Sequence, residues 1–503
     1  MFRSFFLAGF ECATGYNMHG EWIDQIAATE HDLHVDADYD RLVEVGIHAV
    51  REAIRWPLVD RHGRYDFSTV EPFVAAARRH DFDVIWDLFH YGYPDELDPF
   101  ADEFADRFAA YCQAAARFVA SHAEGTCYFT PVNEPSYFAW AAGEVGRFAP
   151  HARGRGAELK FALARAAIRG IEAIWEECPA ARIVNVDPIC RVVPRANDAE
   201  SAEHARRFNT RWVYEFWDVV AGLQRPEFGG SKRHLDIVGL NYYWTNQWEL
   251  GAEGVPLADG DPRRVPLAAL VRDAWRRYRT EVVVAETSAL GEARAPWIHE
   301  LSETAGELLR GGVPLGGICL YPILGMPEWH AREQWTRMGL WDLERDQDAL
   351  RRVACAPMVE ALHAVQERVP AIAGERWISL ARTGREPFEA LGRLVWQRSR
   401  DGSFALRLFR VDRPCRLWVL AVSLRVAGRA VDHVWTAAEL RMIVDDRERW
   451  TLPRVAAVHG IDDVLEDHQR DRDWSAHQGA LAQEAASLAA GERRRRVLRR
   501  ALR

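Results

Sequence analysis

The chain has 503 residues, 48% of them apolar, and a formal net charge of −10 at neutral pH. This length can hold a large core and more than one compact domain. The acidic balance argues against nucleic acid as a partner. The sequence contains no run of about 18 apolar residues, the length that a membrane-spanning helix needs.

The first residues, "MFRSFFLAGF", predict a strand, because no small-residue cleavage site follows their short apolar run before Glu11. The eight cysteines show no Cys-x-x-Cys spacing. Isolated cysteines in apolar runs such as "GGICLYP" are typical of buried thiols in a reducing compartment. We therefore expect a cytoplasmic protein.

Short apolar runs alternate with helical patterns as far as residue 322. The runs are "SFFLAGF", "HAVREAI", "DVIWDLFHYG", "CYFTPVNE", "RIVNVDP", "LDIVGLNYYW", "EVVVAETS" and "LGGICLYP". Between them, stretches such as "DEFADRFAAYCQAAARFVAS" repeat with helical period. Eight strands alternating with helices predict an α/β fold, the closed (β/α)8 TIM barrel. An open doubly wound sheet is the alternative, but the glycine-rich phosphate turn typical of it is not found.

The stretch "DALRRVACAPMVEALHAVQERV" predicts an eighth helix, and Pro370 and Gly374 follow it as a boundary. We expect a barrel domain over residues 1–372 and an additional C-terminal region over 373–503. In that region "GRLVWQRSRDGSFALRLFRV" predicts a β-hairpin with Asp401-Gly402 in its turn. The basic helical tail, "GALAQEAASLAAGERRRRVLRRALR", is either a solvated helix end or a surface for an anionic partner.

Polar side chains stand at or just beyond the ends of the predicted strands, where the active site of such a barrel lies. They are Arg51, His90, Asn133, Glu134, Tyr243, Glu286, Glu328 and Trp329. Glu134 and Glu286, at the fourth and seventh strands, would face each other across the barrel end. Such a pair hydrolyses glycosides, because acetal cleavage needs an acid for the leaving oxygen and an anion for the oxocarbenium-like carbon. Sequence spacing alone leaves retention and inversion of configuration open.

Residues 5 to 344 resemble glycoside hydrolase family 1, the β-glucosidase-like enzymes of the clan with acids on strands four and seven. "TPVNEP" is similar to the family's Asn-Glu-Pro motif, which implies that Glu134 is the acid/base. "VVVAETSALG" is similar to the nucleophile strand, which implies that Glu286 attacks the sugar and that configuration is retained.

Other segments match the family one by one. "VREAIRWP" implies Arg51 near the nucleophile, and "DIVGLNYYW" implies that Tyr243 hydrogen-bonds it. The resemblance also implies sugar contacts for His90 in "LFHYGYP", for Asn133, for Glu328 and Trp329 in "PEWHAREQWTRMGLWDLE", and for Asn17 in "ATGYNMHG". Trp140 and Trp244 are weaker candidates for sugar stacking, and Glu11 and His19 match no motif.

No cofactor or metal is expected. The mechanism that the resemblance implies needs none, and the acids and histidines of "HGEWIDQIAATEHDLH" fit no zinc spacing. The chain departs from the family at Tyr91, at Tyr321 and in "AETS", so the glycone stays open. Glu328 would repel a phosphate, which favours an unphosphorylated glycoside.

The predicted function is a retaining β-glycosidase acting on small β-glycosides, with a small-molecule carbohydrate as its partner. A transglycosylase with the same site and a non-catalytic carbohydrate-binding or scaffold barrel are the alternatives. The sequence leaves the glycone, the aglycone, the oligomeric state and the role of residues 373–503 open.

Overall fold

The computed structural model describes residues 2–123, 125–346, 349–366 and 368, together with the backbone of four strands between residues 393 and 437. The chain divides into two compact units, Phe2–Val365 and the part that begins at Gln366. The predicted boundary at residues 372 and 373 lies outside the described residues. Among the described helices, none combines the length and apolarity needed to cross a membrane.

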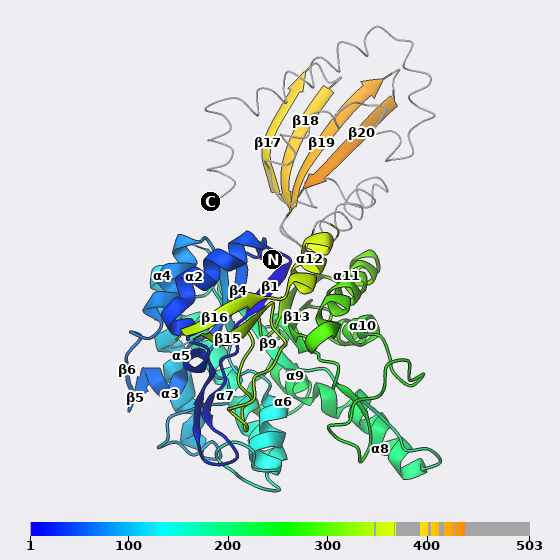
Figure 1. The fold of residues 1–503 in the computed structure, drawn as a ribbon. Coiled ribbons are helices and arrows are strands. Elements are labelled where there is room, and N and C mark those ends of the chain that lie inside the picture. The colour runs from blue at the N-terminus through cyan, green and yellow to red at the C-terminus, as the bar shows by residue number, and fades with distance from the viewer. Residues whose placement is uncertain are drawn as a thin grey trace. The chain divides into compact units, whose positions relative to one another are not determined.

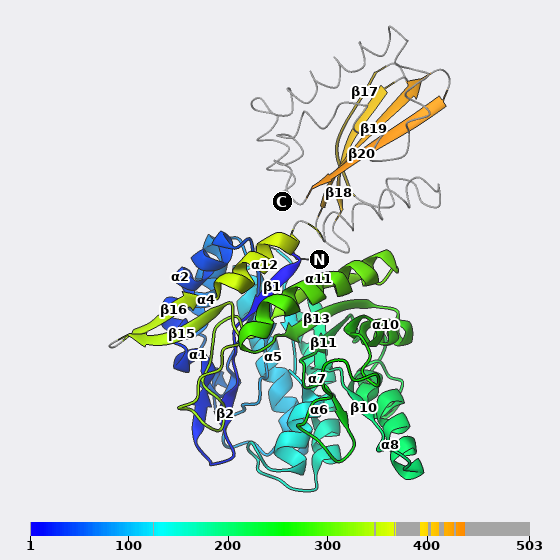
Figure 2. The ribbon, with the colours of Figure 1, turned by 45° about the vertical axis from the view of Figure 1, so that its right-hand side comes forward.

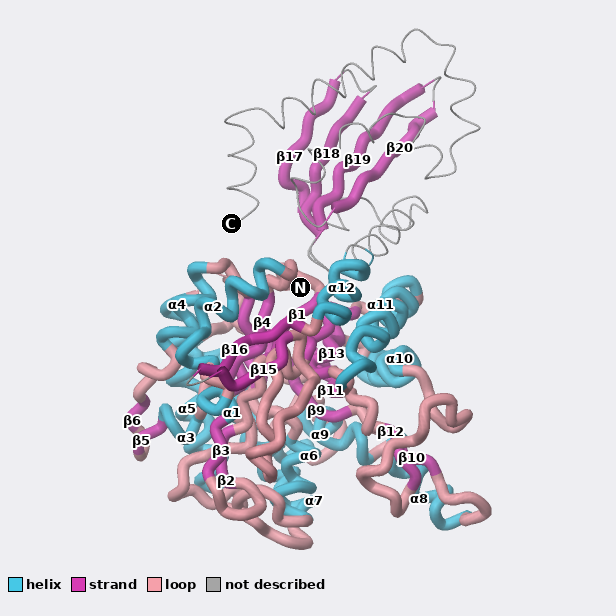
Figure 3. The backbone as a smooth tube through the Cα atoms, in the orientation of Figure 1, coloured by secondary structure: helices cyan, strands magenta, loops and turns pink. Residues whose placement is uncertain are grey.

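Eight parallel strands close into a barrel in the first unit (Figures 1 and 3). Around the barrel their order is β1-β14-β13-β11-β9-β8-β7-β4. Their bounds are β1 Phe6–Gly9, β4 Ala49–Ala53, β7 Asp83–Asp87, β8 Tyr128–Thr130, β9 Arg182–Pro188, β11 Ile237–Asn241, β13 Glu281–Thr287 and β14 Leu315–Leu320. Each strand falls within one of the eight predicted runs, so the (β/α)8 fold is confirmed.

Helices surround the barrel strands (Figure 3). The longer ones are α2 His31–Glu44, α4 Glu71–Arg79, α5 Asp102–His122, α7 Gly156–Glu177, α10 Leu267–Tyr278 and α11 Arg294–Arg310. In α5 the buried residues include Phe104, Phe108, Tyr111, Ala115 and Val119, which recur every three or four positions on the face toward the core. All seven residues of β13 are buried, as expected for a strand covered on both faces.

Shorter elements lie in the connections. Three two-stranded sheets pair β2 Thr14–Tyr16 with β3 Trp22–Asp24, β5 Asp60–Arg61 with β6 Arg64–Tyr65, and β10 Arg191–Val193 with β12 Gln247–Glu249. The connections also contain the short helices α1 Gln25–Ala28, α3 Trp56–Val59, α6 Pro135–Phe138 and α9 Glu215–Val220, the longer helix α8 Ala199–Thr210, and a π-helical turn, η1, over Ala139–Glu144.

The predicted eighth helix is wrong over its first part. Residues Ala349–Ala354 form β16, which pairs antiparallel with β15 Trp341–Asp346, and the helix α12 covers only Ala356–Gln366. This hairpin lies beside α2 in both views of Figures 1 and 2. Arg352 in β16 donates to both carboxylate oxygens of Asp38 in α2, at 2.9 and 3.0 Å. This buried ion pair, remote in sequence, stabilises the strand over the local helical pattern.

The second unit contains a four-stranded antiparallel sheet in the order β17-β18-β19-β20. Its strands are Arg393–Arg400, Phe404–Val411, Leu417–Val426 and Arg429–Ala437. The first two strands pair as the predicted hairpin does, from Arg393 with Arg410 to Arg400 with Phe404. The arginine-rich tail lies outside the described residues.

Candidate active site

Glu134 stands at the carboxyl end of β8, where the backbone turns into α6. Its N–H donates to the carbonyl of Val186 in β9 at 3.1 Å, and it adopts a left-handed conformation with φ of 47°. Two residues later, the N–H and the hydroxyl of Ser136 donate to the two oxygens of Asp187, at 2.9 and 2.5 Å. Since non-glycine residues avoid this conformation, the hydrogen bonds to β9 hold the Glu134 backbone in place.

The Glu134 carboxyl is buried and receives two neutral donors. The Tyr91 hydroxyl donates to Oε2 at 2.6 Å, and the Asn241 amide donates to Oε1 at 2.9 Å. Burial, followed by the nearby charge of Glu286, raises the pKa of Glu134 to about 8 despite these two hydrogen bonds. At neutral pH the protonated form of Glu134 therefore predominates.

Glu286, near the end of β13, has the opposite environment. Nη1 of Arg51 donates to its Oε1 at 2.7 Å, and the Tyr243 hydroxyl donates to its Oε2 at 2.9 Å. Arg51 and Glu286 are both buried. The carboxyl group of Glu286 therefore has a fixed cation as its direct partner, which Glu134 lacks.

Arg51 also begins a closed ring of hydrogen bonds. Its Nε and Nη2 donate to the two oxygens of Asp87 at 3.0 and 2.7 Å, and Nη2 donates to Oδ1 of Asn133 at 2.6 Å. Because Oδ1 accepts from Arg51, the Asn133 amide nitrogen donates to Nε2 of His90 at 3.1 Å. Nδ1 of His90 then donates to Asp87 at 3.3 Å. The ring thus places a proton on Nδ1 of His90. Burial disfavours a second proton on the imidazole, but Cys12 and Asp87 raise the pKa of His90 above its ordinary value.

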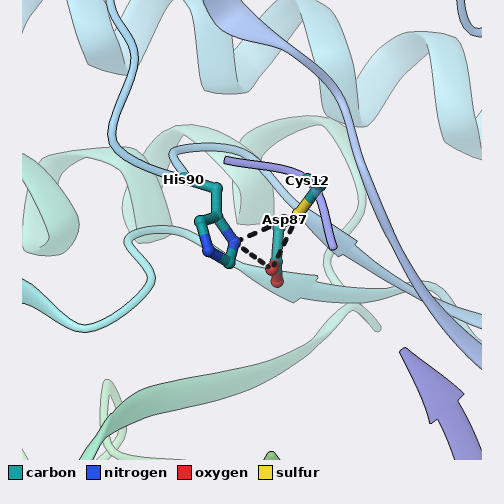
Figure 4. Close-up of side chains that lie close together, drawn as sticks. All are labelled: Cys12, Asp87 and His90. Atoms are coloured by element: carbon teal, nitrogen blue, oxygen red, sulfur yellow. Dashed lines mark hydrogen bonds and ion pairs between the residues drawn. The ribbon is translucent and has the colours of Figure 1, made fainter. Parts of the chain in front are cut away.

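Cys12, Asp87 and His90 form the one group of possible metal ligands found within the described residues (Figure 4). The Cys12 sulfur lies 3.1 Å from Nδ1 of His90 and 3.9 Å from Oδ2 of Asp87. Both oxygens of Asp87 already accept from Arg51. Burial also raises the pKa of Cys12 to about 11, which disfavours the thiolate that a metal would need. We interpret the group as hydrogen-bonded support for His90.

Glu11 is a buried acid of the site that no motif predicts. It follows β1, and its Oε1 accepts from the N–H of Ala13 at 2.9 Å and lies 3.8 Å from Nε2 of His90. Burial raises the pKa of Glu11, and the charge of Glu286 adds to this. A third carboxyl group therefore shares the site with Glu134 and Glu286.

Trp329 and Glu328 lie farther out, after β14. The Trp329 ring packs at 5.7 Å from Tyr91 and 6.1 Å from Tyr137, and no described residue hydrogen-bonds its buried Nε1. Glu328 is exposed, although its charge still contributes to the raised pKa of Tyr137. Trp329 therefore packs beside Tyr91, the hydrogen-bond donor to Glu134, whereas Glu328 is exposed.

The polar atoms of the Asn17 side chain are hydrogen-bonded within the protein, and its sugar contact stays a prediction. Its amide donates to Oε2 of Glu21 at 3.2 Å and to the carbonyl of Trp329 at 3.0 Å, while its Oδ1 accepts from the N–H groups of His19 and Glu21. The side chain is fully buried. Asn17 therefore fastens its own loop to the Trp329 segment. The weaker candidate Trp140 is exposed and packs against Tyr137.

Motif reasoning also missed the acids that support the site. Asp87 holds Arg51 and His90, and Asp187 holds Ser136 beside Glu134. Their signal in the sequence is weak, since each is a single acid at the end of an apolar run. The sequence does show that Tyr91 departs from the family's motif. Its hydrogen bond to Glu134 could not be predicted from the sequence.

Comparison with solved structures finds the same barrel in known glycosidases. A family 1 β-glucosidase from Thermotoga maritima matches with a TM-score of 0.59 at 16% identity, covering 72% of this chain and 97% of that chain. The β-glucosidase from Thermotoga maritima in complex with deoxynojirimycin, and the same enzyme in complex with glucoimidazole, each match with a TM-score of 0.59 at 17% identity and the same coverage. No family model and no curated protein matches the chain. The chain therefore has the fold of the family 1 β-glucosidases, and the resemblance drawn from its motifs is confirmed for the fold.

Proposed function

We propose that the protein is a retaining β-glycosidase that hydrolyses small β-glycosides, with Glu134 as acid/base and Glu286 as nucleophile. The observation that carries this proposal is the contrast between two neighbouring carboxyl groups. Glu286 is paired with Arg51, whereas Glu134 receives only neutral donors and has its pKa raised to about 8. Glycoside cleavage requires one protonated and one ionised carboxyl group. The likeness in fold to β-glucosidases supports the same conclusion.

In the first half-reaction, Glu134 gives its proton to the glycosidic oxygen as the bond from that oxygen to the anomeric carbon breaks. Glu286 attacks the anomeric carbon and forms an ester. Arg51 and Tyr243 hold the two Glu286 oxygens, which orients the nucleophile before the attack. The leaving group departs as a neutral alcohol or phenol.

In the second half-reaction, Glu134 takes a proton from water, and the hydroxide oxygen displaces Glu286 from the anomeric carbon. The ester has no negative charge, so the charge of Glu286 no longer raises the pKa of Glu134. The Tyr91 and Asn241 hydrogen bonds then favour the Glu134 carboxylate. The same residue therefore serves as acid first and as base afterwards.

Sugar hydroxyls would be held by Asn133 and Trp329, with Glu328 at the edge of the site, and by His90 when a sugar hydroxyl takes the place of the Asn133 amide at Nε2. The closed ring through Arg51 and Asp87 orients His90 and Asn133 together. Trp329 offers its Nε1 as a donor without a described partner. In this proposal the barrel domain of residues 1–372 contains the whole site, and its partner is a small carbohydrate.

The test is a panel of 4-nitrophenyl β-glycosides assayed with the wild type, Glu286→Gln and Glu134→Gln. We expect the wild type to hydrolyse at least one sugar and to release the β-anomer first, as seen by NMR. Glu286→Gln should lose hydrolysis by about 10³-fold or more. A 2-deoxy-2-fluoro glycoside should label Glu286, and mass spectrometry would locate the label.

Two outcomes would redirect the proposal. Binding of sugars without turnover of any panel member would favour a carbohydrate-binding barrel. Faster transfer to an added alcohol or sugar than to water would favour the transglycosylase, which uses the same two glutamates.

A further inference from the structure

Aromatic rings lead from Glu134 to the protein surface. The ring of Tyr91, whose hydroxyl binds Glu134, packs at 5.7 Å from Tyr137, and Tyr137 packs at 5.8 Å from Trp140. Trp140 lies in η1, which directly follows α6, and 38% of it is exposed. If Glu134 protonates the leaving oxygen, as proposed above, the rest of the leaving group extends over these rings.

A positive charge lies at the outer end of this path. The Arg147 guanidinium stands 4.9 Å from the centre of the Trp140 ring. Arg147 is exposed, and among the described residues no carboxylate lies within ion-pair distance of it. An arginine on an aromatic face keeps its donors in one plane and available for a second partner.

His330 adds a polar group beside Arg147. Its ring packs at 5.0 Å from Phe148, and its Nδ1 is buried without a hydrogen-bond partner in the described part of the chain. Burial, then the charges of Arg147 and His19, lower the pKa of His330. These groups therefore lie near one another, and the acid on the same segment, Glu328, is exposed to solvent.

We infer that the leaving group of the natural substrate is an aromatic ring with an anionic substituent, which stacks on Trp140 and pairs with Arg147. This inference rests on the proposed glycosidase function. Trp140 supplies a flat apolar face for the ring. The charge complementarity favours a carboxylate or a similar anion over a neutral group such as a second sugar unit, because Arg147 binds an anion more strongly than a neutral hydroxyl.

The first test measures binding of the leaving group alone, so that it does not depend on turnover. The ligands are 4-hydroxybenzoate and its neutral counterpart 4-hydroxybenzamide, titrated calorimetrically into the full chain at low salt. We expect the benzoate to bind about fivefold more tightly, a preference that corresponds to about 1 kcal/mol. The preference should shrink with added salt and disappear in Arg147→Gln.

The matched control is Arg153→Gln. Arg153 is also an exposed arginine, and its backbone forms an isolated antiparallel β-bridge with Val145. This variant should keep the preference for the benzoate. Equal binding of both ligands by the wild type, or equal loss of the preference in both variants, would overturn the inference. Tighter binding of a disaccharide than of either phenol would also overturn it.

The second test compares hydrolysis of 4-carboxyphenyl and 4-carbamoylphenyl β-glycosides of the sugar that the wild type prefers. The ratio of their kcat/KM values should fall about fivefold in Arg147→Gln and stay unchanged in Arg153→Gln. Comparing ratios removes the intrinsic reactivity of each phenol. A lack of any hydrolysis, with benzoate binding intact, would refute the glycosidase proposal and not the anion site.

Discussion

Nη1 of Arg51 lies 2.7 Å from Oε1 of Glu286, with both side chains buried at the carboxyl end of the barrel. The same guanidinium holds Asp87 and Asn133. One side chain therefore holds the proposed nucleophile and two of its polar neighbours in place.

We expect Arg51→Gln to lower kcat/KM by at least about 10²-fold and to lower the free energy of unfolding by about 3–5 kcal/mol, because Asp87 and Glu286 lose their shared cation. Urea unfolding and aryl-glycoside kinetics measure the two effects. Arg55→Gln is the control, since Arg55 makes a buried ion pair with Asp24 at 2.8 Å. Arg55→Gln should lose stability and keep most of its kcat/KM. Equal kinetic losses in the two variants would contradict the role given to Arg51.

The activity of the wild type should fall as the pH rises through about 8, because Glu134 has its pKa raised to about 8 and must be protonated to act as the acid. Tyr91→Phe removes a hydrogen bond that lowers this pKa. The alkaline limb of kcat/KM should therefore move to higher pH, by about 1 unit. The control is Tyr93→Phe, which should leave the limb in place. A shift of the limb to lower pH in Tyr91→Phe would contradict this account of Glu134.

Removing the charge of Asp187 should move the alkaline limb of kcat/KM in the opposite direction, to lower pH. Burial raises the pKa of Asp187 to about 7, and its charge contributes to the raised pKa of Glu134. Asp187→Asn keeps an oxygen for the N–H of Ser136 but removes the charge, so the limb should move to lower pH by less than about 1 unit. Asp187→Ala removes both contacts with Ser136, and its kcat should fall about tenfold. Unchanged pH profiles in both variants would show that Asp187 has only a structural role.

The buried His31 should make stability depend on alkaline pH. Burial disfavours its charged form, but Glu52 and Asp38, at 3.0 and 2.9 Å, raise the pKa of His31 to about 9. Its contribution to stability is complete below the unfolded pKa of about 6.5 and is lost as the pH rises through about 9, a change of about 3 kcal/mol. Urea unfolding at pH 6 and pH 10 measures this loss. His31→Gln should be less stable at pH 6 and should lose less on going to pH 10; an equal loss in both proteins would exclude His31 as the cause.

The sequence was most informative where one local signal decided the structure. Runs such as "EVVVAETS" have no helical pattern that competes with the strand pattern, so all eight barrel strands could be predicted. The stretch 349–354 has a helical pattern, but Arg352 reaches Asp38 from a strand. No local signal contains that contact, because its partner lies 314 residues earlier.

The site shows the same limit. Glu134 and Glu286 lie in recognisable motifs, whereas Glu11, Asp87 and Asp187 acquire their surroundings only when distant strands meet. Asn17 shows a related limit. An asparagine side chain can bind a sugar hydroxyl or hydrogen-bond its own loop to another segment. The contacts of Asn17 with Glu21 and Trp329 are of the second kind, and the sequence does not reveal them.

The ion pair between Arg352 and Asp38 also bears on the order in which the protein is made. Asp38 leaves the ribosome 314 residues before Arg352, which follows the last barrel strand. Until residue 352 emerges, packing of α2 would bury Asp38 without this cation, which is unfavourable. We therefore expect the early strands to fold only after nearly the whole barrel sequence has been synthesised. Until then their apolar faces are exposed, and these are the surfaces to which a chaperone would bind.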